Sequence, residues 1–266
     1  MYPLINIFGR EIGSYALCTI LGLIVCTIFA TVISKKYKVY FEDLILIILV
    51  IIGGLVIGSH ILYFLTNIDT FISFINEGNF TGKQLLNEII KCGGGMVFYG
   101  GFIGGLLGLK IYLSFAHKDS QNTIMNIFAL CVPLFHTFGR IGCFFGGCCY
   151  GIESNFGYTI TNNVLYPSVN GVRRFPVSLV EAIINLILFI ILFTIFRKIN
   201  HEIKLIYFYM FFYSIARFCL EFFRGDEIRG VFWGLSTSQW ISIVLFIVSL
   251  FHFIFKKSGL KENIST

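Results

Sequence analysis

Long apolar stretches alternate with short polar connections along the whole chain. Each stretch is close to the roughly 20 residues that an α-helix needs to cross the hydrocarbon core of a bilayer. The pattern therefore predicts an all-α fold, a polytopic membrane protein with seven transmembrane helices. We expect these helices at about residues 13–34, 44–66, 93–115, 123–142, 178–196, 204–221 and 233–255.

Two of the polar connections are long enough to form structure of their own. Residues 67–92 predict an external arm, in which Phe71 and Ile75 lie on the apolar face of an interfacial helix. Residues 143–177 predict a small external cap. Because no linker, low-complexity tract or repeat interrupts the chain, residues 1–266 are predicted to form a single integral membrane domain.

Composition and charge agree with a membrane protein. The chain is 56% hydrophobic and only 13% charged, against about 25% charged residues in soluble domains. No cleavable signal peptide is evident, because the first apolar run continues as a span. One set of connections is richer in lysine and arginine, including Lys35, Lys36, Arg197 and Lys198, and predicts a cytoplasmic side with the N-terminus outside and the C-terminus inside. The basic residues are scattered, so no nucleic-acid partner is expected.

One arginine stands at the end of the apolar run 123–138. Arg140 is followed at once by a segment rich in glycine, cysteine and phenylalanine that ends at Gly151 and is expected to form a turn. Arginine at membrane depth costs at least about 2.5–3.5 kcal/mol, so Arg140 is expected to face a cavity and hold an anion. The nearest abundant anion is a phospholipid phosphate, which points to lipid chemistry.

A second charged group lies in the sixth stretch. Arg217 and Glu221 are four residues apart and share one face of a helix. Either Glu221 orients Arg217 to bind an anion, or the two form a structural ion pair. With Arg140, two arginines and one carboxylate predict a surplus of positive charge. Glu181 opens the fifth stretch, where a role at the helix N-terminus and a role in the site are both open.

Several uncharged residues have a functional and a structural interpretation. The glycine-rich run 93–105 predicts close helix packing and also lets backbone amides approach an anion. Tyr15 and Tyr99 either face the cavity or belong to an interfacial belt. His136 lies one turn before Arg140 and is a candidate proton carrier.

Three of the eight cysteines cluster at the predicted external edge. Cys143, Cys148 and Cys149 lack the CxxC spacing that is typical of a zinc site, although His136 and Cys92 could approach them. Packing of small side chains is favoured over a disulfide or a reactive thiol, and the sequence predicts no metal and no cofactor.

Several motifs in the same order resemble the bacterial phosphatidylglycerol–prolipoprotein diacylglyceryl transferases. The similarity covers most of the chain. The motifs are Ser14-Tyr15, residues 100–104, residues 139–151, residues 175–181, residues 217–224 and residues 235–239.

The resemblance implies a reaction at a bacterial inner membrane. A diacylglyceryl group moves from phosphatidylglycerol to a cysteine sulfur in the signal peptide of a prolipoprotein. A thioether forms and glycerol 1-phosphate leaves. The resemblance further implies catalytic roles for Arg217, Glu221 and Tyr15 and binding of the phospholipid head group by Arg140. Tyr99 is predicted as a further catalytic residue. The other residues predicted to bind substrate are Gly100, Gly101, Gly139, Cys143, Gly151, Glu181 and Arg224.

The chain also departs from the family pattern. Tyr99 stands where the family commonly has histidine, Cys143 where it has asparagine and Cys148 where it has glutamate. These departures leave two alternatives open. One is a related membrane enzyme with a different acceptor or with thiol chemistry, and the other is a lipid or anion transporter.

Overall fold

The computed structural model describes residues 3–262, except for residues 8, 38, 40, 79, 96, 116–117, 164–166, 199–202 and 227–230. Its contacts group into two compact units. The first combines Met1–Ile33 with Asn122–Thr266, and the second is Ser34–Gln121. The single domain expected over residues 1–266 stays a prediction, and each unit is described by itself.

The predicted all-α class is confirmed. The helices are α1 Ser14–Lys36, α2 Phe41–Thr66, α3 Ile68–Asn76, α4 Gly82–Gly93, α5 Phe98–Phe115, α6 Lys118–Gly146, α7 Val177–Lys198, α8 Leu205–Glu221 and α9 Thr237–Glu262. Short antiparallel pairs join β1 Leu4–Ile7 to β2 Arg10–Gly13, β3 Glu153–Thr159 to β4 Arg173–Arg174, and β5 Val231–Phe232 to β6 Leu235–Ser236. One 3-10 turn, η1, covers Pro167–Val169.

Among the residues that the structure describes, five helices are long and apolar enough to cross a membrane. They lie within α1, α2, α6, α7 and α9. Helix α8 has 17 residues, and the apolar part of α5 is Ile103–Phe115, so both are shorter than the other five. The chain is therefore a multi-pass membrane protein, while the count of seven spans stays a prediction.

Two predicted boundaries are wrong. The segment expected to turn at Arg140 continues as helix α6 to Gly146. The chain turns only at Gly147 and Cys149, whose φ angles are 73° and 57°. The last span was expected from residue 233, but residues 231–236 form the β5–β6 pair and α9 begins at Thr237. A tight turn at Gly234, with φ of 77°, separates the two strands.

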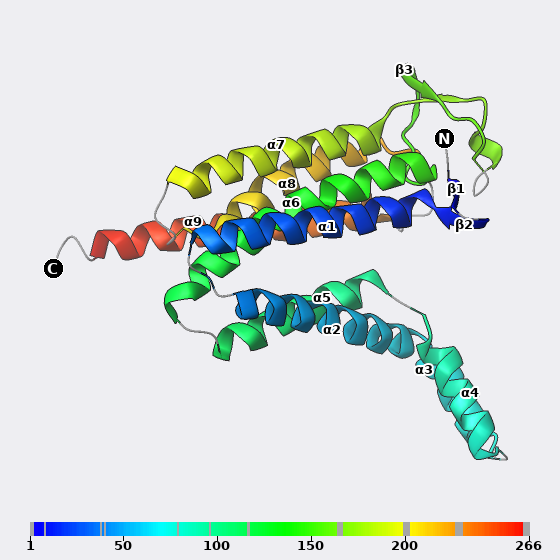
Figure 1. Cartoon of the computed structure of the whole chain (residues 1–266). Coiled ribbons are helices and arrows are strands. Elements are labelled where there is room, and N and C mark those ends of the chain that lie inside the picture. Colours follow the sequence, from blue (N-terminus) through cyan, green and yellow to red (C-terminus); the bar gives the residue numbers. More distant parts are fainter. Residues whose placement is uncertain are drawn as a thin grey trace. The chain divides into compact units, whose positions relative to one another are not determined.

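The first unit is a bundle of α1, α6, α7, α8 and α9 (Figure 1). The Cys26 thiol of α1 lies 3.6 Å from the Cys131 carbonyl oxygen of α6. The ring of Phe29 meets the ring of Phe189 on α7 edge to face, with centroids 5.2 Å apart. Because the helices alternate in direction, the carboxyl ends of α6 and α8 and the amino ends of α7 and α9 lie at the same end of the bundle.

The second unit packs α2 against α5 through glycines. A Cβ added to Gly54 would clash with the Gly104 carbonyl oxygen, and one added to Gly100 would clash with the Gly58 carbonyl oxygen. The packing interpretation of the glycine-rich run is thereby confirmed, because such close backbone contact needs residues without side chains.

The predicted arm, residues 67–92, contains two helices instead of one. Helix α3 matches the predicted apolar helix, and α4 was expected as a polar connection. A capping box begins α4, in which the Thr81 hydroxyl accepts from the Gln84 amide and the Gln84 side chain accepts from the Thr81 amide at 2.8 Å. The interfacial and external position of the arm stays a prediction.

Candidate functional site

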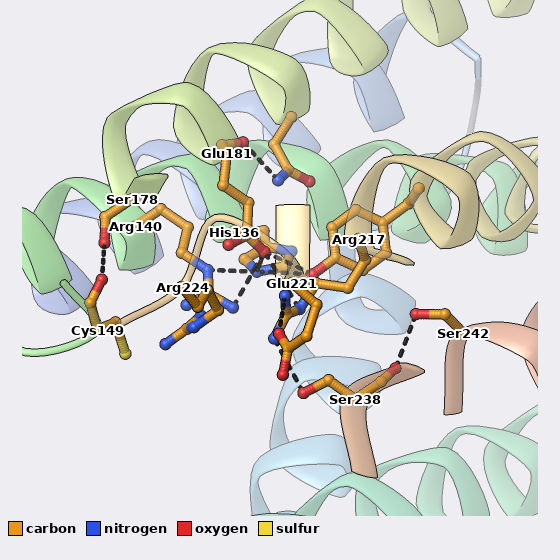
Figure 2. Close-up of polar contacts among 12 residues, drawn as sticks. His136, Arg140, Cys149, Ser178, Glu181, Arg217, Glu221, Arg224, Ser238 and Ser242 are labelled. Carbon is orange, nitrogen blue, oxygen red and sulfur yellow. Dashed lines mark hydrogen bonds and ion pairs between the residues drawn. The ribbon is translucent and has the colours of Figure 1, made fainter. Parts of the chain in front are cut away.

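A polar stripe along α8 begins the site. Tyr209, Tyr213, Arg217 and Glu221 follow one another at four-residue intervals and share a face of this helix. Arg217 Nη1 lies 2.7 Å from Glu221 Oε2, and Arg217 Nη2 donates to Ser238 Oγ on α9 at 2.9 Å (Figure 2). The predicted contact between Arg217 and Glu221 is therefore confirmed, and Arg217 is tied to both α8 and α9.

Glu181 of α7 lies at the centre of the site. Its side chain is completely buried, and Oε1 lies 3.1 Å from Arg140 Nη2 and 3.9 Å from Arg217 Nε. The Tyr213 hydroxyl donates to the same oxygen at 2.8 Å. Figure 2 shows His136, Arg140 and Arg217 directed toward this carboxylate. Of the two interpretations left open for Glu181, the structure favours the site.

The predicted surplus of positive charge is wrong. It counted Arg140 and Arg217 against Glu221 alone, whereas Glu181 adds a second carboxylate in contact with both arginines. The four charges balance. The Nη1 group of Arg140 still has unused hydrogen-bond donors, because it has no partner among the described residues.

The hydrogen bonds of His136 assign its tautomer. Tyr209 donates its hydroxyl hydrogen to Asn185 Oδ1 at 2.9 Å, so its oxygen accepts from His136 Nδ1 at 3.0 Å. His136 Nε2 then accepts from Arg140 Nε at 3.2 Å. Both ring nitrogens of the neutral imidazole are engaged. His136 thus holds Arg140 in place, which argues against its predicted role as a proton carrier.

One face of α6 presents the site residues in sequence. His136, Gly139, Arg140 and Cys143 lie at the three- and four-residue spacings that share a helix face. A Cβ built on Gly139 meets no atom within 4 Å. The missing side chain leaves open space at the residue that precedes Arg140.

Gly151 and Arg224 meet where three chain segments cross. They form an isolated antiparallel bridge, and a Cβ on Gly151 would clash with the Phe175 carbonyl oxygen. Arg224 is clamped by Asp226 through bonds of 3.0 and 2.9 Å. The structure thus gives Gly151 a packing role, and its predicted binding of substrate stays a prediction. Arg224 Nη1 is buried and has no hydrogen-bond partner among the described residues.

The turn after α6 gathers three cysteines that are irregularly spaced in sequence. The sulfur atoms of Cys143, Cys148 and Cys149 all lie within 4.8 Å of one another. The pKa of the Cys149 thiol lies well below its ordinary value, because hydrogen bonds from Cys143 and Cys148 and the positive charges of Arg224 and Arg140 favour the thiolate. Sequence spacing could not reveal this triangle, because the left-handed backbone at Gly147 and Cys149 folds the chain back onto the end of α6.

The remaining predicted residues lie in both units. Tyr15 of α1 is half exposed, and its Cα lies 3.2 Å from a Cβ built on Gly142. Tyr99, Gly100 and Gly101 belong to α5 of the second unit. The two glycines pack against α2, and the side chain of Tyr99 lies outside the described residues. Their roles toward a substrate stay predictions.

Sequence reasoning missed four polar residues of the network, namely Asn185, Tyr209, Tyr213 and Ser238. A signal for three of them was present. Tyr209 and Tyr213 continue the four-residue spacing of Arg217 and Glu221, and Asn185 follows Glu181 at the same interval. Polar groups at that interval in an apolar helix mark a buried polar face.

Comparisons with known proteins agree with this site. Residues 3–255 match the family model of the prolipoprotein diacylglyceryl transferases. The phosphatidylglycerol–prolipoprotein diacylglyceryl transferase of Clostridium tetani is 32% identical over 257 residues, which cover 94% of this chain and 95% of the relative. A second transferase of this name, from Clostridium perfringens, is 34% identical over 266 residues, or 97% and 96% of the two chains. These matches do not favour a transporter or an enzyme with another acceptor. The chain belongs to the prolipoprotein diacylglyceryl transferase family.

Proposed function

We propose that the polar network around Glu181 performs the transfer of a diacylglyceryl group from phosphatidylglycerol to prolipoproteins, the reaction for which the relatives of this chain are named. The observation that carries this proposal is the pair of arginines held on one buried carboxylate, at distances of 3.1 and 3.9 Å. Such an arrangement fixes the guanidinium groups before a substrate arrives.

Arg140 is the proposed contact for the phospholipid phosphate. Its Nη1 donors are open, while Nε and Nη2 are held by His136 and Glu181. The amino ends of α7 and α9 lie at the same end of the bundle, and helix amino ends favour nearby negative charge. These helix amino ends attract the phosphate, whereas the charged side chains of the site balance one another.

The chemistry then needs a thiolate and a good leaving group. The acceptor sulfur attacks the glyceryl carbon, the carbon–oxygen bond to the phosphate breaks, and glycerol 1-phosphate leaves with the electron pair. Fixed positive charge on the departing phosphate is the main source of catalysis. The same field lowers the pKa of the acceptor thiol, whose proton passes to water.

Two glutamates orient the arginines. Arg217 has all three of its nitrogens directed at Glu181, Glu221 and Ser238, so we assign it a positioning role. Glu181 Oε2 is buried and has no hydrogen-bond partner among the described residues. It is placed to accept a hydrogen bond from a hydroxyl of the glycerol head group.

We further propose that the site faces outward. The amino end of α1 lies at the end of the bundle that holds the site. With the N-terminus outside, as the distribution of basic residues predicts, the site opens on the outer face of the inner membrane. Signal-peptide cysteines of exported prolipoproteins are exposed on that face.

A reconstituted reaction tests the proposal. The purified chain is mixed with phosphatidylglycerol and a synthetic signal peptide that contains the acceptor cysteine, and mass spectrometry follows the peptide. We expect a diacylglyceryl mass gain on the cysteine, none on a peptide with serine in its place, and none with phosphatidylethanolamine as donor. Arg140→Ala and Arg217→Ala should abolish the gain while the protein still inserts, and normal transfer by both variants would overturn the proposal.

A further inference from the structure

The triangle of cysteine sulfurs has the dimensions of a metal site. In a tetrahedral zinc site with Zn–S bonds of about 2.3 Å, neighbouring sulfurs lie ~3.8 Å apart. The three sulfurs here lie within 4.8 Å of one another. They therefore need to approach by no more than about an ångström to bind one ion.

Residues from other parts of the chain hold the cysteine turn in place through hydrogen bonds. The Ser178 hydroxyl donates to the Cys149 carbonyl oxygen at 2.9 Å, and the Asn163 side chain donates to the Gly147 carbonyl oxygen at 2.8 Å. Cys143 is fixed on α6. Such supporting hydrogen bonds are typical of metal sites, because they orient the ligating residues.

A buried arginine with one unused donor group lies next to the triangle. The Arg224 side chain is only 3% exposed and pairs with Asp226 through Nε and Nη2, whereas Nη1 has no hydrogen-bond partner among the described residues. The positive charge of Arg224 acts on Cys149. Three thiolates around a divalent ion carry a net charge of minus one, and a thiolate is a stronger acceptor for Nη1 than a neutral thiol is.

We propose that Cys143, Cys148 and Cys149 bind one zinc ion through three thiolates, and that its fourth position takes the acceptor cysteine of the prolipoprotein. Cys143 is buried, whereas Cys148 and Cys149 are partly exposed, so one side of the ion is open. Three protein ligands with one open position are typical of catalytic zinc. This proposal rests on the proposed transferase function.

The zinc promotes deprotonation of the acceptor thiol, for which the polar network offers no good base. His136 has both ring nitrogens engaged, and two arginines stabilise the charged form of Glu181, so both are poor acceptors of a thiol proton. A thiol that binds zinc loses its proton to water. Its sulfur remains a thiolate beside Arg140, which lies one turn before Cys143. The metal-bound sulfur attacks the glyceryl carbon, the carbon–oxygen bond breaks, glycerol phosphate leaves, and the thioether then dissociates from zinc.

Metal content and cobalt spectroscopy test the site. The full chain is purified in detergent under reducing conditions and loaded with zinc. We expect one zinc per chain, and at least about a tenfold loss of affinity, the lower end of the effect of altering a supporting residue, in Cys143→Ser, Cys148→Ser and Cys149→Ser. Cys219→Ser, which changes an exposed cysteine of α8, is the matched control and should bind zinc normally. Thermal unfolding verifies that each variant is folded.

The fourth ligand is tested with cobalt in place of zinc. The acceptor peptide should change the cobalt absorption bands, and the peptide with serine should not. The proposal would be overturned if the reduced protein retains no zinc after incubation with zinc. Identical cobalt spectra with both peptides would also overturn it. Full transfer by metal-free protein would also overturn it while the transferase function stands. Absence of transfer by zinc-loaded protein that binds the peptide would overturn the proposed function instead.

Discussion

Arg140 on α6 and Glu181 on α7 form an ion pair, with Nη2 and Oε1 3.1 Å apart and the carboxylate completely buried. The pair connects the two helices directly. Since Arg217 approaches the same oxygen from α8, the position of three helices depends on one carboxylate.

Removing that carboxylate should destabilise the protein. Glu181→Gln leaves two buried arginines around a neutral amide, and breaking a buried pair costs about 3–5 kcal/mol. We expect a lower thermal midpoint in detergent and loss of transfer. The double variant Glu181→Gln with Arg140→Gln should lose less stability than the sum of the single variants, because the two charges interact directly. Strictly additive losses would contradict the ion pair.

The two arginines should respond differently to lysine. Arg140→Lys keeps the charge but loses the open Nη1 donors, so we expect a folded protein whose affinity for phosphatidylglycerol falls roughly 10- to 100-fold, the equivalent of about 1.5–3 kcal/mol for a hydrogen bond to a charged group. Arg217→Lys cannot reach Glu181, Glu221 and Ser238 together, so its thermal midpoint should fall as well. Lipid titration by native mass spectrometry and thermal unfolding separate the two effects. Unchanged lipid affinity in Arg140→Lys would argue against phosphate binding at Nη1.

His136 should matter for positioning and not for proton transfer. His136→Phe keeps a ring but leaves Tyr209 and Arg140 Nε without this partner, and loss of such bonds lowers activity by roughly tenfold. The shape of the pH–rate profile should stay the same as in the unchanged protein. A profile that loses one limb in His136→Phe would show that the imidazole titrates during the reaction.

The sequence predicted the helices better than it predicted their ends. Apolar length alone located α1, α2, α6, α7 and α9, because burial in a bilayer forces a helix whatever its neighbours do. It failed at Arg140, where glycines and cysteines suggested a turn. Gly142 instead lies within α6 and lets α1 pack closely against it, since a Cβ built there would lie 3.0 Å from the Cβ of Cys18.

The charged residues of the site and the Arg217–Glu221 pair were predicted, but the partners of Glu181 were not. Arginine and glutamate in an apolar stretch stand out, since each is costly in the membrane. That Glu181 lies between Arg140 and Arg217 depends on how α6, α7 and α8 pack, which spacing along one helix does not define. The clustering of Cys143, Cys148 and Cys149 was predicted, but the close approach of their three sulfurs was not, because it depends on a left-handed residue at Cys149.

Transfer activity should depend on the size of the side chain at position 139. Gly139→Ala meets no atom within 4 Å and should fold and transfer normally. Gly139→Leu fills the space beside Arg140, so transfer should fall while the thermal midpoint stays near that of the unchanged protein. Gly142→Leu is the matched comparison and should unfold more easily, because this face of α6 packs on Tyr15 and Cys18. Full activity in Gly139→Leu would show that the substrate does not use this space.

Two neighbouring glycines of α2 should have opposite effects on stability. A Cβ on Gly53 meets nothing within 4 Å, whereas one on Gly54 clashes with the Gly104 carbonyl oxygen of α5. Gly53→Ala should raise the free energy of unfolding by about 0.5–1 kcal/mol, since alanine favours a helix more than glycine does. Gly54→Ala should lower it by about 1–3 kcal/mol, because α2 and α5 must move apart. Thermal unfolding of the two variants in the same detergent compares them directly. Equal midpoints would mean that α2 and α5 do not pack through their glycines, since helix propensity alone would raise both.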